Sequence, residues 1–207
     1  MSQKLAYDPL NIVICGIGGQ GNIVASELLG SVIVDMGYIC AIGETYGASQ
    51  RGGSVMSHVR VSDHKALSVL IPMGRAHIIV GFEPLETLRM VRDYGNKDTT
   101  VVYDPRPAYP LGVLSGEAVY PEIEDIDKEI REICGKVYVV EASQIAIDAG
   151  NSKAANIALM GALTGVPESP VTIDDFMVAI NQRFKGAVLE LNKKVIVEGN
   201  QAVTSQI

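Results

Sequence analysis

The chain has 207 residues, 47% of them hydrophobic and 20% charged, with a formal net charge of −7. This composition is typical of a folded protein and disfavours a disordered one. The 17 Lys and Arg residues are scattered, which argues against nucleic acid as the main partner, because phosphate binding needs clustered basic side chains. Because no apolar run approaches the ~18 to 20 residues of a membrane span, and the polar N-terminus does not resemble a signal peptide, we expect a cytoplasmic protein without membrane contact.

The first half of the chain alternates short apolar runs with amphipathic segments. We expect strands at 12–15, 38–42, 55–61, 77–80 and 99–103, of which 55–61 is half-buried and 12–15, 38–42 and 77–80 are buried. Helices are expected at 22–36 and 84–94, with a loop at 43–53. The segment 12–42 has the order and length of a βαβ unit.

The second half continues this alternation and ends in helices. A proline-rich loop at 105–110 precedes an acidic helix that begins after Pro121 and ends at about Cys134, a strand at 137–140, helices at 141–148 and 153–163, and a linker at 165–170. Thr172 and Asp175 form a capping box for the next helix, and a last helix of about 13 residues follows Gly186. The pattern predicts an α/β fold, an open, mostly parallel, Rossmann-like sheet with helices on both faces and a C-terminal helical segment. We expect one domain, with a sheet core over 1–165 and the helices of 166–207 packed on it.

The three cysteines, Cys15, Cys40 and Cys134, show no C-x-x-C spacing. Two of them lie in apolar runs typical of buried strands, so we expect reduced, buried thiols. Three isolated cysteines cannot ligate a Cys₄ iron–sulfur cluster within one chain.

A glycine-rich turn follows the first predicted strand and precedes the first helix: Gly16-Ile17-Gly18-Gly19-Gln20-Gly21. This is the G-x-G-x-x-G pattern of dinucleotide-binding folds, and the helix N-terminus after it can bind an anion. Glu44 would be the acidic residue that binds the ribose, although it comes 28 residues after Gly16 and the usual spacing is about 20. A dinucleotide site, a tight turn without a ligand and a docking surface for another protein all fit this segment.

A second loop is the more informative segment: Glu44-Thr45-Tyr46-Gly47-Ala48-Ser49-Gln50-Arg51-Gly52-Gly53. The planar guanidinium of Arg51 can bind a carboxylate or phosphate at two points, beside glycines that let another backbone come close. In a parallel sheet both glycine-rich loops should lie at the carboxyl edge and form one surface.

Together these loops resemble the γ-type (small) subunit of 2-oxoacid:ferredoxin oxidoreductases. The glycine turn, followed by Glu-x-x-Gly-x-x-Gln-Arg-Gly-Gly-Ser-Val running into a strand, matches that family in order and spacing over residues 11–61. Residues 72–77 and 81–89 resemble its indolepyruvate branch, and Asn156, Gly161-Ala162 and Glu190-x-Asn192 fit its closing helices. Tyr46 and Ala48 stand where the indolepyruvate branch has a histidine and a methionine, so the resemblance leaves the oxoacid open.

The resemblance implies an accessory subunit that is inactive alone. Enzymes of this family convert a 2-oxoacid, coenzyme A and oxidised ferredoxin into an acyl-CoA, carbon dioxide and reduced ferredoxin, using thiamine diphosphate and [4Fe–4S] clusters. This chain has no recognisable signature for thiamine diphosphate and magnesium, so a larger partner subunit would hold these cofactors. Ferredoxin would be an indirect partner. Whether coenzyme A contacts this chain, and whether it forms a homodimer, stay open.

No catalytic residue is expected in this chain. The candidate site is the surface made by the two loops: Gly16, Gly18, Gly19, Gln20, Gly21, Glu44, Gln50, Arg51, Gly52 and Gly53. Arg51 and Glu44 would order a surface that faces the partner, or Arg51 would meet an anionic group of coenzyme A.

Other functions have weaker support in the sequence. His58, His64 and His77 lack the spacing of metal ligands, and Ser49 and Ser54 lack a neighbouring His and Asp pattern, so we expect neither a metal site nor a nucleophilic triad. The alternatives are a free-standing dinucleotide-dependent enzyme that uses the glycine turn, and a binding or regulatory module that senses a nucleotide.

Overall fold

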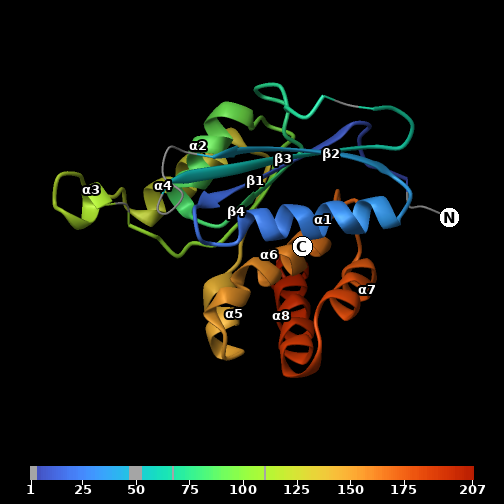
Figure 1. Ribbon diagram of the computed structural model, residues 1–207. Coiled ribbons are helices and arrows are strands. Elements are labelled where there is room, and N and C mark those ends of the chain that lie inside the picture. The colour runs from blue at the N-terminus through green and yellow to red at the C-terminus, as the bar shows by residue number, and fades with distance from the viewer. Residues whose placement is uncertain (1–3, 47–52, 67, 110) are drawn as a thin grey trace.

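A computed structural model describes residues 4–46, 53–66, 68–109 and 111–207, and a six-stranded sheet lies at the centre of these residues (Figure 1). The strand order is β2-β3-β1-β4-β5-β6. The strands are β1 (Leu10–Ile17), β2 (Ile39–Tyr46), β3 (Ser54–Ser62), β4 (Ile78–Gly81), β5 (Thr100–Tyr103) and β6 (Lys136–Val139). Strands β1, β4, β5 and β6 pair in parallel, whereas β3 pairs antiparallel with both β1 and β2. The predicted mostly parallel α/β sheet is confirmed.

Helices cover both faces of this sheet (Figure 1). One face carries α1 (Asn22–Asp35), α5 (Ala142–Asp148), α6 (Ala155–Gly165), α7 (Ile173–Arg183) and α8 (Gly186–Thr204). The other face carries α2 (Pro84–Tyr94) and α4 (Ile123–Ile133). Two short elements, α3 (Leu111–Leu114) and the 3₁₀ helix η1 (Ser152–Ala154), lie in connections. None of the helices among the described residues is long and apolar enough to cross a membrane.

Strands β1 and β2 do not form the adjacent βαβ unit that the sequence predicts. They run in the same direction, but β3 lies between them and pairs with both. Strand β3 is also buried along most of its length, so the prediction of a half-buried strand is wrong. Its valines Val59 and Val61 pack in the core beneath α1, and on the other face His58 is 1% and Arg60 8% exposed. Alternating Val and polar residues look the same in sequence whether the polar face meets solvent or a polar interior.

Strand β2 is an edge strand and is longer than predicted. It includes Gly43 and Glu44, which the sequence assigns to a loop. Ile39 is 39% exposed and Cys40 is half-buried, so the expectation of a fully buried strand is wrong here. An edge strand has a hydrogen-bonded neighbour on one side only, which leaves its outer side chains open. The other two cysteines are buried, and all three are free thiols.

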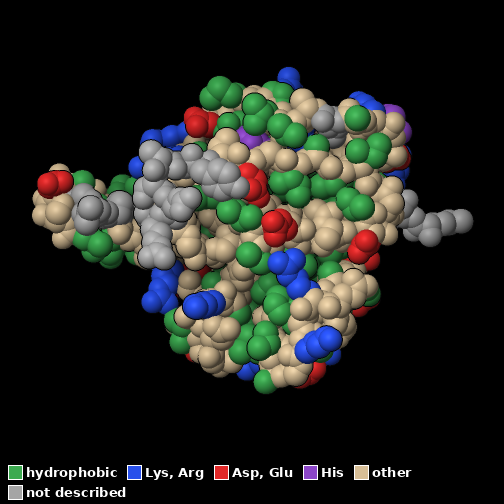
Figure 2. All heavy atoms as spheres, viewed as in Figure 1, with side chains coloured by type: hydrophobic (Ala, Val, Ile, Leu, Met, Phe, Trp, Pro, Cys, Tyr) green, Lys and Arg blue, Asp and Glu red, His purple; other side chains and the backbone are tan. Residues whose placement is uncertain are grey.

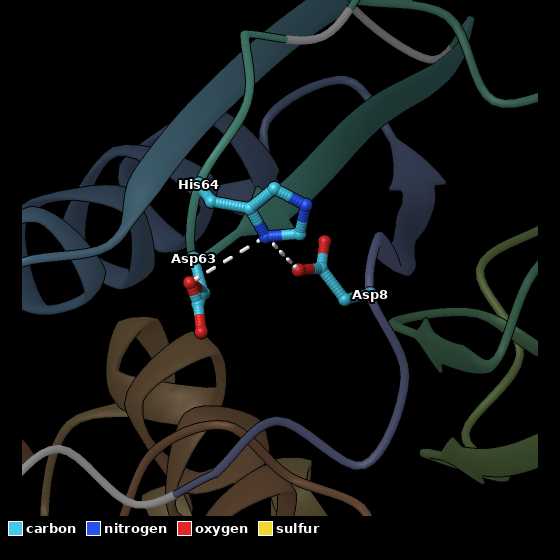
Figure 3. Close-up of side chains that lie close together, drawn as sticks. All are labelled: Asp8, Asp63 and His64. Carbon is cyan, nitrogen blue, oxygen red and sulfur yellow. Dashed lines mark ion pairs between the residues drawn. The ribbon is translucent and has the colours of Figure 1, made fainter.

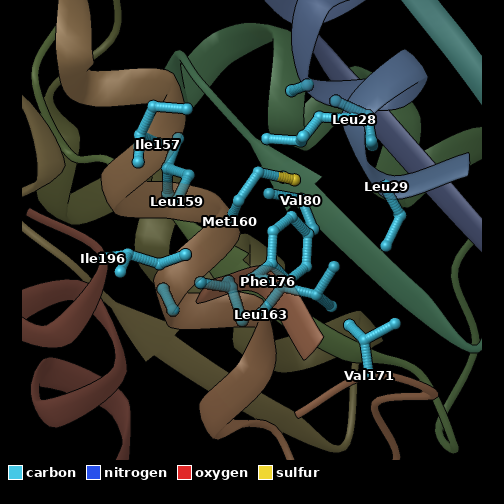
Figure 4. Packing of buried hydrophobic residues seen from close by; sticks show 14 of the residues in the cluster. Leu28, Leu29, Val80, Ile157, Leu159, Met160, Leu163, Val171, Phe176 and Ile196 are labelled. Atoms are coloured by element: carbon cyan, nitrogen blue, oxygen red, sulfur yellow. The ribbon is translucent and has the colours of Figure 1, made fainter. Parts of the chain in front are cut away.

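Among the C-terminal helices, α7 begins at the predicted capping box, in which Thr172 and Asp175 each accept a hydrogen bond from the other's backbone N–H. Helix α8 has 19 residues and is therefore longer than expected. It packs on α6, which is buried along almost its whole length. Figure 4 shows the core beside this pair, where Met160 and Leu163 of α6 meet Phe176 of α7 and Ile196 of α8.

Glycines allow the backbones of α6 and α8 to come close. A Cβ atom added to Gly161 would lie 2.2 Å from the Ile196 carbonyl oxygen, and one added to Gly199 would lie 2.0 Å from the Ala158 carbonyl oxygen. No side-chain rotation can relieve these contacts, because the obstructing atoms belong to the backbone of the neighbouring helix. The close approach of α6 and α8 therefore requires glycine at both positions.

We predict that Gly199→Ala lowers the free energy of unfolding by about 1 to 3 kcal/mol, because overpacking must push the two helices apart. The matched control is Gly30→Ala in α1, whose new Cβ would lie 2.5 Å from the end of the flexible Ile42 side chain and 3.7 Å from Cys40 Sγ, with no backbone atom as close. Urea unfolding of both variants checks this. Equal stability of Gly199→Ala and Gly30→Ala would contradict it.

Candidate functional site

A crevice of about 580 Å³ lies at the carboxyl ends of β1, β4 and β5. Its lining includes the glycine turn after β1, Phe82 after β4, Asp104 and Arg106 after β5, and residues of α5, η1 and α6. The helices that follow β1 and β4 pack on opposite faces of the sheet. In open α/β folds ligands bind where such connections diverge, so this crevice is the candidate site.

The side chain of Gln20 holds the glycine turn in place. Its Oε1 accepts a hydrogen bond from the Ile17 N–H (2.7 Å), and its Nε2 donates to the Phe82 carbonyl (3.0 Å). Gln20 therefore ties the end of β1 to the end of β4. A Cβ on Gly16 would lie 2.7 Å from Gln20 Oε1, so a larger residue there would displace this bridge.

Hydrogen-bond donors converge on the crevice at the start of α1. Gly21 is the N-cap with φ 89°, and no side chain caps the helix, so its first N–H groups stay available. Asn156 of α6 is 8% exposed and lines the crevice. Its Oδ1 accepts from the Ile157 N–H (2.8 Å), which directs Nδ2 toward Gly21, where an added Cβ would lie 2.7 Å away. No described residue accepts a hydrogen bond from this Nδ2.

The charged groups of the crevice also favour an anion. The exposed cations Arg106 and Lys153 line it. The one buried carboxylate, Asp104, is 1% exposed and accepts hydrogen bonds from the Ser143 N–H (2.8 Å), the Ser143 hydroxyl (2.5 Å) and the Arg106 N–H (3.1 Å). Burial raises the pKa of Asp104, and the Ser143 and Arg106 hydrogen bonds oppose that rise. Because local donors occupy its oxygens, the groups left for a ligand are mainly N–H donors and cations.

The structure brings together the described parts of the two predicted loops. The Gly18 N–H donates to the Gly53 carbonyl oxygen (2.8 Å), and Gly19, Gln20 and Gly21 line the crevice beside this contact. Gln50, Arg51 and Gly52 lie outside the described residues.

Glu44 has a different environment. It lies in β2, accepts a hydrogen bond from the Ser26 hydroxyl of α1 (3.2 Å), and is not among the described residues that line the crevice. Because β3 separates β2 from β1, Glu44 does not lie on the strand next to β1, where dinucleotide-binding folds carry the acid that binds the ribose.

Sequence reasoning did not identify Asp104, Arg106, Ser143 and Lys153 as site residues. Asp104 had a usable signal, because it directly follows a buried strand and the carboxyl ends of parallel strands carry ligand contacts. Ser143 and Lys153 had none, since the packing of α5 and η1 against the crevice depends on contacts distant in sequence.

A projecting arm, residues 109 and 111–119, leaves the same edge of the sheet and contains α3 (Figures 1 and 2). Both ends of the arm are held by Glu83, which is 1% exposed and accepts hydrogen bonds from the Tyr120 hydroxyl and the Ala108 N–H (3.4 Å). On the arm, Leu114 is 70% and Val119 is 93% exposed. Burial raises the pKa of Glu83, and the Tyr120 hydrogen bond opposes that rise.

Away from the crevice, the structure places His64 beside two carboxylates (Figure 3). Its Nδ1 lies 2.9 Å from Asp8 Oδ2 and 3.6 Å from Asp63 Oδ1. All three residues are exposed, and the arrangement is that of a surface ion pair. Histidine spacing could not predict this grouping, because Asp8 comes from the segment before β1.

Comparison with known proteins assigns the family. Residues 11–202 match the family described as pyruvate ferredoxin/flavodoxin oxidoreductase. The chain belongs to this family. A relative, the indolepyruvate oxidoreductase subunit IorB of Archaeoglobus fulgidus, is 38% identical over 198 residues, which cover 95% of this chain and 97% of the relative. The resemblance inferred from the two glycine-rich loops is confirmed.

Two solved structures share the fold of this chain. The pyruvate oxidoreductase subunit PORC of Thermotoga maritima matches with a TM-score of 0.71 at 18% identity, over 94% of this chain and 97% of that one. The 2-oxoglutarate:ferredoxin oxidoreductase of Magnetococcus marinus, solved with 2-oxoglutarate, coenzyme A and succinyl-CoA bound, matches with a TM-score of 0.73 at 22% identity. That match covers 96% of this chain but 32% of the other, so there the fold is one part of a longer polypeptide.

We predict that Glu83 makes the stability of the protein depend on pH. Its pKa in the folded protein lies above the ordinary value of 4.5, so the folded state binds more protons than the unfolded state between these two pKa values. The contribution of this carboxyl to the free energy of unfolding therefore falls as pH rises through that window. Glu83→Gln removes this contribution, so the stability of the wild type relative to the variant should decline with rising pH.

Urea unfolding at a series of pH values measures this difference. Glu117→Gln, at an exposed position on the arm, is the control and should follow the wild-type profile. A wild-type advantage over Glu83→Gln that grows as pH rises would mean that the pKa is lowered instead.

Proposed function

We propose that this chain is the accessory subunit of a 2-oxoacid:ferredoxin oxidoreductase that acts on indolepyruvate or another 2-oxoacid. The family match and a relative named as an indolepyruvate oxidoreductase subunit, aligned over nearly the full length of both chains, support this proposal. The chain is inactive alone and works in the cytoplasm, where its three thiols stay reduced.

A larger partner subunit holds thiamine diphosphate, magnesium and the [4Fe–4S] clusters, and ferredoxin takes electrons from those clusters. The donor chemistry of this chain supports that division. Cys15 lies in β1, Cys40 in β2 and Cys134 directly after α4, so the three thiols come from separate elements and fall short of a Cys₄ ligand set. Thiamine diphosphate supplies the carbanion chemistry of the decarboxylation when it is bound.

The contribution of this chain is to bind the anionic part of coenzyme A in the crevice. The convergence of unpaired donors is the observation that carries this proposal. The first N–H groups of α1 and Asn156 Nδ2 would face phosphate oxygens, and Lys153 and Arg106 would neutralise their charge. Arg51, two residues before Gly53, stays the predicted further contact to an anionic group.

A free-standing dinucleotide enzyme is not proposed. The G-x-G-x-x-G pattern is present, but Glu44, the acid that would bind the ribose, accepts a hydrogen bond from Ser26 of α1. Its strand, β2, is separated from β1 by β3. The tight turn and the close approach of Asn156 already require these glycines, whether or not a dinucleotide binds.

The test is reconstitution with the larger subunit from the same genome. We expect reduction of ferredoxin that depends on 2-oxoacid and coenzyme A only when both chains are present. Full activity of the larger subunit without this chain would contradict the accessory role.

Asn156→Asp tests the crevice within the same complex. Aspartate keeps an acceptor for the Ile157 N–H and replaces the Nδ2 donor with a negatively charged oxygen, so the fold should persist. We predict that the KM for coenzyme A rises about tenfold or more, a loss of about 1.4 kcal/mol in binding, while kcat changes little. Lys194→Ala, on the exposed side of α8, should leave both constants unchanged. An unchanged KM in an assembled Asn156→Asp complex would remove coenzyme A from the crevice but leave the accessory role intact.

A further inference from the structure

A second cavity, the amino-edge pocket, has a volume of about 360 Å³ and lies at the opposite edge of the sheet from the crevice. Its polar lining is Asp8, Asn11, Arg60, Arg75 and His77, with Tyr7 and two prolines as its remaining walls. Strand β1 connects the two edges, and its 8 residues rise roughly 3.3 Å each, so more than about 20 Å separates the pocket from the crevice. The two cavities are therefore independent sites.

Arg60 is a buried cation without a counter-ion among the described residues. It is 8% exposed, and its Nε donates to Asn11 Oδ1 (3.0 Å) while Nη1 donates to the Ser68 carbonyl (2.9 Å) and hydroxyl (2.8 Å) and to the Leu70 carbonyl (3.1 Å). All of these acceptors are neutral, and Nη2 donates to no described residue. A buried charge is costly unless an opposite charge compensates it. The pocket beside Arg60 thus favours an anion.

Asn11 forms hydrogen bonds with two further residues that line the pocket. Its backbone N–H donates to His77 Nδ1 (3.0 Å), and its Nδ2 donates to the Arg75 carbonyl (2.9 Å). Because His77 Nδ1 accepts a hydrogen bond, the proton of the neutral ring lies on Nε2, which is then a donor. Burial, followed by the charge of Arg75, lowers the pKa of His77, whereas Asp98 opposes this. The exposed guanidinium of Arg75 forms no hydrogen bond or ion pair with a described residue.

The rest of the pocket lining determines which kind of anion fits the pocket. The Tyr7 ring stacks on His77 with centroids 4.1 Å apart and planes at 9°, and two prolines add further apolar surface. The carboxylate of Asp8 also lines the pocket, but it is paired with His64 at 2.9 Å (Figure 3). The pocket thus combines two arginines and an imidazole N–H with an apolar wall, at the lower end of the volume range of small-molecule sites.

We propose that the amino-edge pocket binds a small organic acid, with the carboxylate between Arg60 and Arg75 and the apolar body against the Tyr7–His77 stack. Planar guanidinium groups match the geometry of a carboxylate, and the ring stack buries a hydrocarbon or aromatic group. The inference does not depend on the proposed function, because none of these residues lines the crevice.

The test is titration of the purified chain with phenylacetate, followed by calorimetry and by amide NMR. We expect saturable binding, with chemical-shift changes at His77 and Asn11. Arg75→Gln, at an exposed position, should weaken binding about tenfold, since it removes one charged hydrogen-bond partner. Arg60→Lys should weaken it further, because lysine keeps the charge but loses the fork.

Three controls limit the interpretation. Arg183→Gln, at an exposed position on α7, and Asn156→Asp in the crevice should leave phenylacetate binding unchanged. Inorganic phosphate should bind more weakly, since it gains nothing from the ring stack. Absence of saturable phenylacetate binding, equal affinity of Arg75→Gln and wild type, or binding of phosphate alone would each overturn the proposal. Because Arg75→Gln removes no hydrogen bond of the fold, the test holds even if Arg60→Lys fails to fold.

Discussion

The uncapped N-terminus of α1 is the constraint on which the crevice depends. A helix start leaves several N–H groups without partners, and most helices satisfy one of them with a capping side chain. Here the N-cap is Gly21, which has no side chain, and Gln20 uses its own amide to tie β1 to β4. The side chain nearest to a Cβ at Gly21, that of Asn156, offers its Nδ2, which is a further donor and cannot satisfy an N–H group. The N–H groups therefore stay available to an anion from outside the chain.

The sheet topology determines which segments surround this helix start. Strand β2 has the same direction as β1, so β2 ends and β3 begins at the carboxyl edge, where Gly53 meets Gly18. Parallel pairing of β1, β4 and β5 brings Phe82 and Asp104 to that edge as well. Asp104 then binds the first turn of α5 through Ser143, which fixes that helix at the rim of the crevice. Strand pairing thus brings segments that are far apart in sequence together at one site.

Local patterns predicted much of this architecture. Apolar runs, the capping box of α7 and the glycine turn each reflect short-range chemistry, and the elements they indicate are present. Long-range pairing decided the features that were missed. The polar face of β3 is buried because Arg60 bonds to Asn11, 49 residues away, and His58 accepts a hydrogen bond from the Ile71 N–H (3.3 Å). No periodicity reveals that these polar residues have interior partners.

In the candidate site, too, features with a local sequence signal were predicted and features that depend on long-range packing were missed. The glycine turn and Gly53 were predicted to lie together, and they do, although the strand between β1 and β2 was not foreseen. Asn156 was noted for its family resemblance, but its role as a donor depends on the packing of α6 against the start of α1. Lys153 and Ser143 are common residue types in helical segments and carry no local signal of a site.

Hydrogen–deuterium exchange of the assembled complex, with and without coenzyme A, tests the central claim most directly. If the crevice holds the anionic part of coenzyme A, exchange should slow at the start of α1, residues 21–24, and around Asn156, while the α7 amides stay unchanged. Unchanged exchange at both places, under conditions where coenzyme A saturates turnover, would contradict the account.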